Sequence, residues 1–289
     1  MRTCSKASDS WYIMQAEIER LFENPPAEYT AEHRNLFGAF LTALTEGRVR
    51  AAEPDDSTVT GWRVNAWVKQ GILLGFRMGV NSDMSVGALS FRDKNTYPMQ
   101  QFGAEKNIRI VPGGSSVREG AYLGRNVTCM PPMYINVGAY VDDGTMVDSH
   151  ALVGSCAQVG RQCHISAASQ IGGVLEPVGA LPVVIEDEVL VGGNCGVYEG
   201  TVVKCRAVLG TGTILNRSTP VYDLVRNTIH RATEEDPLVV PEGAVVIAGS
   251  RAITNGPGRD WGISVYTPVI VKYRDAKTDT RIQLEDLLR

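Results

Sequence analysis

The chain lacks any run of basic residues. Its 28 Lys and Arg are interspersed with 32 Asp and Glu, and the formal net charge is −4. A nucleic-acid surface needs clustered cations to neutralise phosphates, so we expect no nucleic-acid partner. No stretch is apolar over the length that spans a bilayer, and residues 1–12 contain no apolar signal core. These absences predict a cytoplasmic protein without a membrane partner.

The chain also lacks the cysteine patterns of metal sites and disulfide frameworks. It has six cysteines, and no two of them form a C-x-x-C pair. We therefore expect neither structural zinc nor disulfides, and no metal requirement.

A six-residue repeat dominates the middle of the chain. Aliphatic or similarly buriable residues recur at every sixth position, the repeat breaks at Pro177, and it resumes after an insertion of a hexad plus two residues. Small residues usually follow four positions later. The main positions are Val111, Val117, Leu123, Cys129, Ile135, Val141, Val147, Val153, Val159, Ile165 and Ile171, then Ile185, Val191, Val197, Val203, Leu209 and Leu215. The small positions are Ala139, Thr145, Ala151, Ala157, Cys163, Ser169, Cys195, Thr201, Ala207 and Thr213.

A period of six fits neither the 3.6 of a helix nor the 2 of a simple strand. It fits a triangular coil in which each hexad is one short strand plus a corner, with the large and the small residue both facing inward. The sequence therefore predicts a mainly β protein built on a hexapeptide parallel β-helix. Cys129, Cys163 and Cys195 are then expected to be buried structural thiols.

The flanking segments differ from the coil. Residues 11–44 predict two helices divided by Asn24-Pro25-Pro26, and residues 62–76 predict another. Beyond Leu215, residues 239–248 and 265–273 suggest strands, and 282–288 a short helix. We predict an N-terminal helical domain (1–108), a coil domain (109–220) and a β-rich cap (221–289) that covers the open end of the coil.

Several polar residues on this frame are candidates for chemistry. Asp148 and His150 lie two apart, which would point them to the same side of one strand. Arg109 stands just before the coil, and the apolar loop 177–184 is long for a turn. Loops that leave a rigid scaffold are common sites of binding residues. The alternative is a pure scaffold.

Particular segments carry a family resemblance. The run MYINVGAYVDDGTMVDSHALVGSCAQVG (133–160), then IGGVLEP (171–177) and VIEDEVLVGG (184–193), resembles the tetrahydrodipicolinate N-succinyltransferases. Weaker likeness extends over nearly the whole chain, including LTEGRVRAAE (44–53), WVKQGILLGFR (67–77) and IRIVP (108–112). The resemblance implies a left-handed coil, a homotrimer with active sites between subunits, and transfer of succinyl from succinyl-CoA to a dicarboxylic amine.

The resemblance also implies roles for individual residues. Arg109 of IRIVP would bind a substrate carboxylate through its planar fork. Asp148 of GTMVD would position the amine and take its proton, unless it is a corner aspartate bonded to backbone N–H groups. Gly172 and Gly173, with Gly196 in a later hexad, would lie along the pantetheine chain of CoA, or they are tight-corner glycines.

The chain departs from the family pattern at three places. Gly196 stands where the family has a catalytic Glu, His150 where it commonly has a bulky aromatic, and Pro220 where it often has an Arg. His150 is then either a replacement base or a corner histidine. Three functions stay open: succinyl transfer to tetrahydrodipicolinate or a close analogue, acetyl-CoA-dependent acylation in a specialised pathway such as that of a tabtoxin-type β-lactam, and a catalytically silent trimer.

Overall fold

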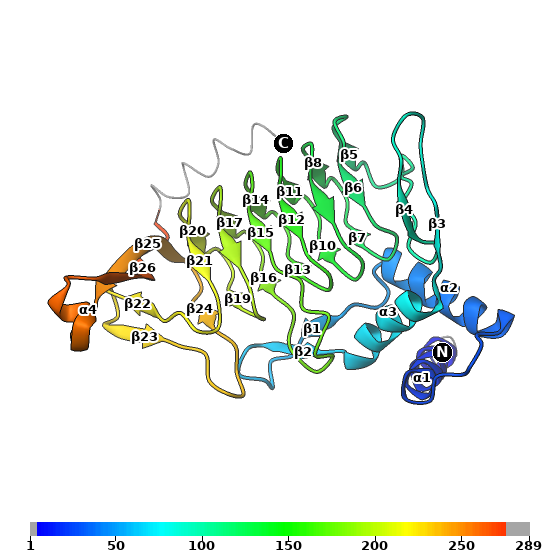
Figure 1. Cartoon of the computed structure of the whole chain (residues 1–289), viewed down its shortest axis with the longest axis horizontal. Coiled ribbons are helices and arrows are strands. Elements are labelled where there is room, and N and C mark those ends of the chain that lie inside the picture. Colours follow the sequence, from blue (N-terminus) through cyan, green and yellow to red (C-terminus); the bar gives the residue numbers. More distant parts are fainter. Residues whose placement is uncertain (1–4, 276–289) are drawn as a thin grey trace.

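The computed structural model describes residues 5–275, in which three parallel sheets form the sides of a coil (Figure 1). Each complete turn of the coil contributes one two-residue strand to each sheet. Sheet I contains β7 (Tyr122–Leu123), β10 (Tyr140–Val141), β13 (Gln158–Val159), β16 (Val184–Ile185), β19 (Val202–Val203) and β24 (Val239–Val240). Sheet III contains β6 (Ser116–Val117), β9 (Tyr134–Ile135), β12 (Leu152–Val153), β15 (Gln170–Ile171), β18 (Gly196–Val197) and β21 (Ile214–Leu215).

Sheet II is the longest because an antiparallel extension continues it at one end. Its coil strands are β5 (Arg109–Ile110), β8 (Thr128–Cys129), β11 (Met146–Val147), β14 (His164–Ile165), β17 (Leu190–Val191) and β20 (Val208–Leu209). The extension contains β25 (Ala244–Ala252), β26 (Ser264–Tyr273), β22 (Val221–Asp223) and β23 (Thr228–His230), with the short helix α4 (Gly256–Asp260) between β25 and β26.

The core of the coil consists of the residues that the repeat identifies. The main positions from Val117 to Leu215 are at most 2% exposed, and the ten small positions are equally buried. The predicted mainly β class and the parallel β-helix are thereby confirmed, as is the burial of Cys129, Cys163 and Cys195. Val141 pairs with Val159, which is 18 residues later in the chain. Val159 pairs with Ile185, which is 18 plus eight residues later, so the insertion has the expected length of a hexad plus two residues.

The repeat begins one residue earlier than predicted. Ile110, not Val111, pairs with Cys129 and packs against the core, whereas Val117 pairs with Ile135 in the regular register. The segment 111–116 therefore carries one extra residue. It contains Gly113 and Gly114, both at positive φ, where L side chains are strained. At the other end, β24 and β25 pair with β19 and β20, so coil pairing continues beyond residue 220.

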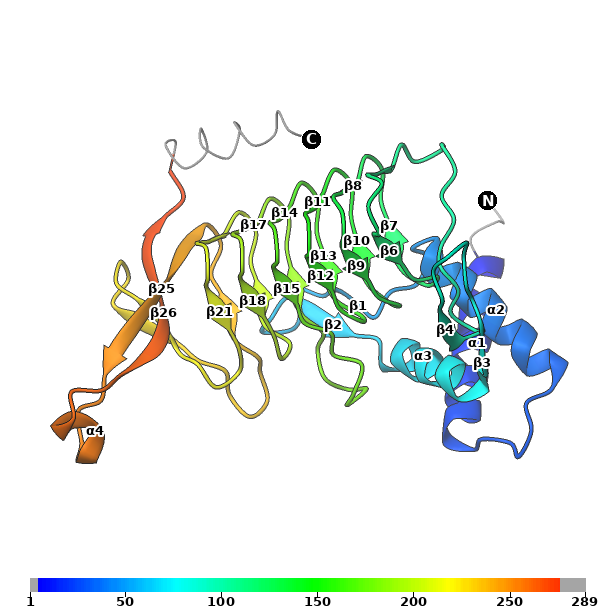
Figure 2. The same ribbon diagram turned by 45° about the horizontal axis from the view of Figure 1, so that its top comes forward.

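Helices and two hairpins lie next to the coil, and the helices gather at the end that holds its first turns (Figure 2). The helices are α1 (Ser5–Glu23), α2 (Ala31–Thr45) and α3 (Ala66–Met78), and the hairpins are β1 (Ala52–Pro54) with β2 (Trp62–Val64) and β3 (Asn81–Asp83) with β4 (Arg92–Lys94). The first two helices confirm the prediction, and the side chain of Thr30 caps α2. The third helix was predicted too early: Trp62–Val64 pairs with β1 as a strand. The helix predicted at 282–288 lies outside the described residues.

The helical part packs directly on the coil. Its core residues, among them Phe37, Phe40 and Ile72, form one cluster with Val137 and Cys156 of the coil. Gly71 and Gly75 of α3 permit this packing, because a Cβ at either would lie within 2.6 Å of an aromatic ring or hydroxyl of Phe40, Phe37 or Tyr97. No helix in the described range is long and apolar enough to span a membrane.

The inward positions should not tolerate charge. We expect Val153→Asp to give insoluble or unfolded protein, because an unpaired carboxylate in the core costs several kcal/mol or forces a shifted pKa. Ala167 is an exposed residue in a corner turn of the coil, so Ala167→Asp is the matched control. Soluble yield and thermal unfolding measure both variants. A folded Val153→Asp variant with an unchanged melting temperature would contradict the inward assignment.

Candidate functional site

The residues predicted to be catalytic lie at a corner of the coil. The strand β11 ends at Val147, and residues 148–151 form the turn from sheet II to sheet III. The prediction that Asp148 and His150 share one strand and one side is therefore wrong. Positive φ angles recur at such corners, and His150 has a φ of 62°. The two side chains consequently leave the turn in different directions.

Asp148 faces sheet II. Its Oδ2 lies 3.6 Å from Nε2 of His164, and its Oδ1 accepts a 2.6 Å hydrogen bond from the N–H of Ser149. The contact with Ser149 is typical of a corner aspartate, and it fixes the carboxylate against the backbone. The carboxylate is partly exposed and lies beside the imidazole of His164. Arg109 is exposed in β5 of the same sheet. Because β5 and β11 are separated only by β8, their backbones lie ~10 Å apart.

His150 faces sheet III. It is exposed, and its backbone N–H donates to the carbonyl of Pro132. Its side chain borders a hollow of about 310 Å³, which is lined by Gly114, Ser116, Pro132, Met133, Tyr134, Ala151, Leu152 and Gln170. Within one chain, His150 and Asp148 therefore do not form a catalytic pair.

A large cavity lies at the corner between sheets III and I. It has a volume of about 740 Å³, and its walls come from the β1–β2 hairpin, the excursion that leaves the coil after β15, and the corners after β18 and β21. The excursion thus borders a binding-sized cavity, as its length and apolar character suggested. Lining residues include Thr60, Trp62, Gly172, Gly173, Pro177, Leu181, Tyr198, Glu199, Arg217 and Asp236.

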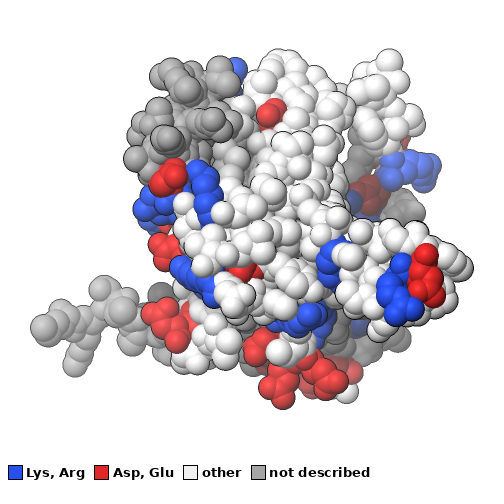
Figure 3. Space-filling view, turned by 90° about the vertical axis from the view of Figure 1, so that its left-hand side faces the viewer, with Lys and Arg blue, Asp and Glu red and all other residues white. Residues whose placement is uncertain are grey.

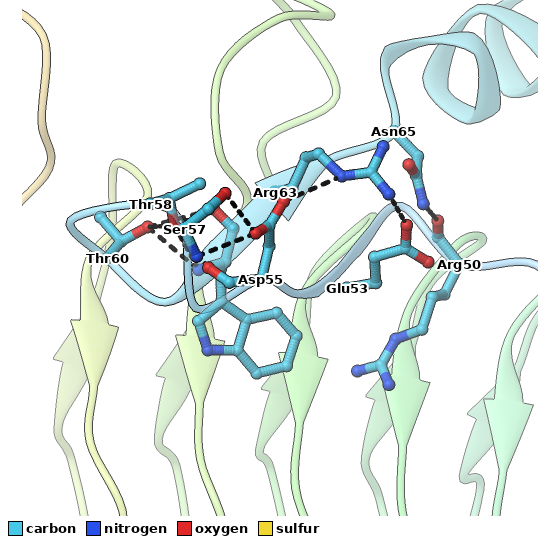
Figure 4. Close-up of polar contacts among 9 residues, drawn as sticks. Arg50, Glu53, Asp55, Ser57, Thr58, Thr60, Arg63 and Asn65 are labelled. Carbon is cyan, nitrogen blue, oxygen red and sulfur yellow. Dashed lines mark hydrogen bonds and ion pairs between the residues drawn. The ribbon is translucent and has the colours of Figure 1, made fainter.

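Polar contacts fix the hairpin wall of this cavity. Thr58 and Thr60 bond to the backbone of Trp62, and Arg63 pairs with Asp55 and Glu53 (Figure 4). Trp62 donates from Nε1 to Glu186 of the coil at 2.9 Å. Burial alone would raise the Glu186 pKa, but bonds from Lys204, Trp62 and the Cys205 N–H hold that pKa below its ordinary value. Glu186 is therefore an ionised anchor between hairpin and coil.

A buried lysine fixes the excursion. Lys69 of α3 is fully buried, and its Nζ donates to the carbonyl of Ala180. Burial lowers the pKa of Lys69 to about 8. The amine thus ties the helical part to the loop that forms the opposite wall of the cavity.

The three predicted CoA glycines have different surroundings. Gly172 and Gly173 line the cavity. They are also tight-corner residues, because a Cβ on Gly173 would lie 2.6 Å from the N of Ser155. Gly196 is buried in β18, and the ring of Tyr198 covers it. Any ligand in the cavity meets Tyr198 at this point rather than Gly196.

The described residues contain no group of three or more His, Cys, Asp or Glu side chains placed to hold a metal ion. Charges of both signs lie side by side on the end of the molecule that carries the β25–β26 extension (Figure 3).

Comparison with known proteins identifies the family. A model described as the N-terminal domain of tetrahydrodipicolinate N-succinyltransferase matches residues 13–78. A 2,3,4,5-tetrahydropyridine-2,6-dicarboxylate N-succinyltransferase of Aromatoleum aromaticum is 43% identical, over 96% of this chain and 98% of its own. The like-named protein of Bordetella avium is 42% identical over the same shares. The chain belongs to the tetrahydrodipicolinate N-succinyltransferase family.

A solved structure supports the fold at low identity. A chain from Campylobacter jejuni, described as a 2,3,4,5-tetrahydropyridine-2-carboxylate N-succinyltransferase, matches with a TM-score of 0.55 and 16% identity. The match covers 88% of this chain and 64% of that one. The family resemblance itself is confirmed by the sequence relatives, which cover 96% of this chain.

Sequence reasoning missed three members of these sites. His164 falls at an outward strand position, and only the 18-residue register brings it beside Asp148. Trp62 was assigned to a helix, although a strand places its indole on Glu186. Tyr198 was not predicted, although the two preceding turns of the coil have glycines, Gly154 and Gly172, at the equivalent place. An aromatic residue at this point of the repeat was the available signal.

Proposed function

We propose that the protein transfers succinyl from succinyl-CoA to the amine of tetrahydrodipicolinate in its open form, 2-amino-6-oxopimelate, or of a close analogue. The observation that carries this proposal is the identity of about 40% to succinyltransferases over nearly the full length of both chains. The amine nitrogen attacks the thioester carbonyl, a C–N bond forms and the C–S bond breaks. A base takes the amine proton and then gives it to the departing thiolate, so CoA leaves as the thiol.

The active unit in this proposal is a homotrimer. Sheet I is covered within the chain, since Arg50 stacks over Tyr140 at 3.8 Å and bonds to Gln158, and the hairpin lies beside it. Sheets II and III present partly exposed apolar residues such as Leu190, Val208 and Leu152. Subunit contacts through these faces would bring the Asp148 side of one chain toward another chain. A site shared between subunits also accommodates the divergence of Asp148 and His150.

A second donor, acetyl-CoA, is favoured by one observation. The space over Gly196, where relatives are expected to have an acidic side chain, is filled by an aromatic ring. A fuller and less polar site suits a shorter acyl group without a distal carboxylate. Gly172 and Gly173 at the cavity edge are the proposed contacts of the pantetheine arm of either donor.

Thiol release from the purified protein tests the function. With 2-aminopimelate as acceptor, we expect acceptor-dependent release from succinyl-CoA, and the rate with acetyl-CoA measures donor preference. Succinyl should be preferred if a cation or backbone donors hold its distal carboxylate. Faster thiol release from acetyl-CoA than from succinyl-CoA would identify acetyl-CoA as the donor instead. No release above the acceptor-free background with either donor would favour a catalytically silent trimer.

Arg109 is proposed to bind a substrate carboxylate. We expect Arg109→Ala to raise KM for the acceptor more than it lowers kcat, because a carboxylate clamp acts in the ground and transition states alike. Arg109→Lys should restore binding only in part, since a point charge lacks the planar fork. Steady-state kinetics with varied acceptor measures both variants. An unchanged KM in the two variants would remove Arg109 from the site.

Asp148 and His150 are the proposed proton acceptors. Asp148→Asn keeps the shape but removes basicity, so we expect a kcat loss in the range of ~10²–10⁴ with little change in CoA binding. His150→Phe separates the two interpretations of the histidine. If His150 is the base, this variant loses a similar factor in kcat. If His150 is a corner residue, as its exposed turn favours, the kinetics stay unchanged.

A further inference from the structure

Gly196 is an exception on the outer surface of sheet III. The first residue of each strand of this sheet points outward, and these residues are Ser116, Tyr134, Leu152, Gln170, Gly196 and Ile214. Gly196 alone among them has no side chain. The position is nevertheless filled. A Cβ built on Gly196 would lie 2.4 Å from Cε2 and 2.8 Å from Oη of Tyr198.

The same ring rests on a second glycine. A Cβ on Gly172, in the preceding turn of the coil, would lie 2.8 Å from Cδ1 of Tyr198. The backbone at Tyr198 is fixed by the turns on both sides. The N–H of Tyr198 donates to the carbonyl of Leu215, and the carbonyl of the preceding residue, Val197, accepts from the N–H of Gly172. One edge of the ring therefore lies over Gly172, and the hydroxyl end lies over Gly196.

The tyrosine and the glycine form a matched pair. The residues that occupy the place of Tyr198 in the two preceding turns of the coil are glycines, Gly154 and Gly172. Contacts below 3.0 Å to a Cβ do not occur in practice. A side chain at residue 196 and the ring in its present position therefore exclude one another.

The hydroxyl of Tyr198 is unpaired in the described part of the chain, and the residue that carries it borders the cavity. The residue is partly exposed and lines the 740 Å³ cavity. Among residues 5–275, no protein group forms a hydrogen bond with this hydroxyl. A phenol that is half embedded and unpaired can donate one hydrogen bond and accept others.

We propose that Tyr198 is a substrate-contacting residue that replaces the side chain missing at Gly196. Its ring forms the cavity wall at this corner, and its hydroxyl donates a hydrogen bond to a substrate oxygen at the reacting end. The inference rests on the proposed acyl transfer. It assigns part of the transition-state stabilisation to a group other than Asp148 or His150.

A double-mutant cycle tests the pair. Tyr198→Phe keeps the ring and removes the hydroxyl, so we expect kcat to fall on the order of 10²-fold, the usual effect of losing one such donor, with little change in KM. Gly196→Ala displaces the ring and should lower kcat similarly. Because both changes act through one hydroxyl, the double variant should lose little more than Tyr198→Phe alone.

Matched controls separate this effect from general damage. Tyr222→Phe removes a hydroxyl from β22 of the extension, and Gly38→Ala adds a methyl where nothing lies within 4 Å. Both should keep wild-type kinetics, and thermal unfolding should show all variants folded.

Three results would overturn the proposal. A Tyr198→Phe variant with kcat within about twofold of wild type would remove the hydroxyl from the site. Additive losses in the double variant would show that Gly196→Ala acts through strain elsewhere. A wild-type protein inactive with both acyl-CoA donors would refute the acyl-transfer function itself, and the role of Tyr198 with it.

Discussion

The structure depends on the burial of one large aliphatic side chain per hexad against the hexads above and below it. A two-residue strand has too few hydrogen bonds and too little apolar surface to persist alone. In the coil each interior strand pairs on both sides, as Val153 does with Ile135 and Ile171. Stability therefore arises between neighbouring turns, and the 18-residue register becomes rigid. Each corner is thereby fixed in space relative to the corners that precede and follow it.

The corners are where this rigidity serves function. The backbone there follows a recurring turn with a residue at positive φ, and the side chains are released from the inward constraint. The excursion leaves the coil at one corner and adds a cavity wall.

Buried polar contacts hold the excursion and the β1–β2 hairpin in place. Lys69 donates to the excursion, and Glu186 holds the hairpin through Trp62. Both groups are partly or fully removed from water, so their bonds define position more firmly than exposed ion pairs would.

The sequence predicted the coil well because its period reports directly on burial. Every main position from Val117 onward and all small positions proved to be inside. The errors came where the period gives no information. The segment 112–115 contains one extra residue that the repeat does not reveal. The sequence therefore predicted an inward position for Val111, whereas Ile110 pairs with Cys129. Trp62 was assigned to a helix by composition, although pairing with Pro54 makes it a strand. The different directions of Asp148 and His150 depend on corner dihedrals that spacing alone does not express.

The site shows a further limit of single-position comparison. The glycine at 196 indicates a lost function when it is considered alone, since it can supply neither charge nor base. In three dimensions the Tyr198 ring packs directly on the α-carbon of Gly196 and also on Gly172. Any side chain at 196 would thus require displacing the ring, because its first carbon would lie 2.4 Å from the present position of Cε2 of Tyr198. The glycine at 196 and the position of the Tyr198 ring therefore depend on one another in this chain.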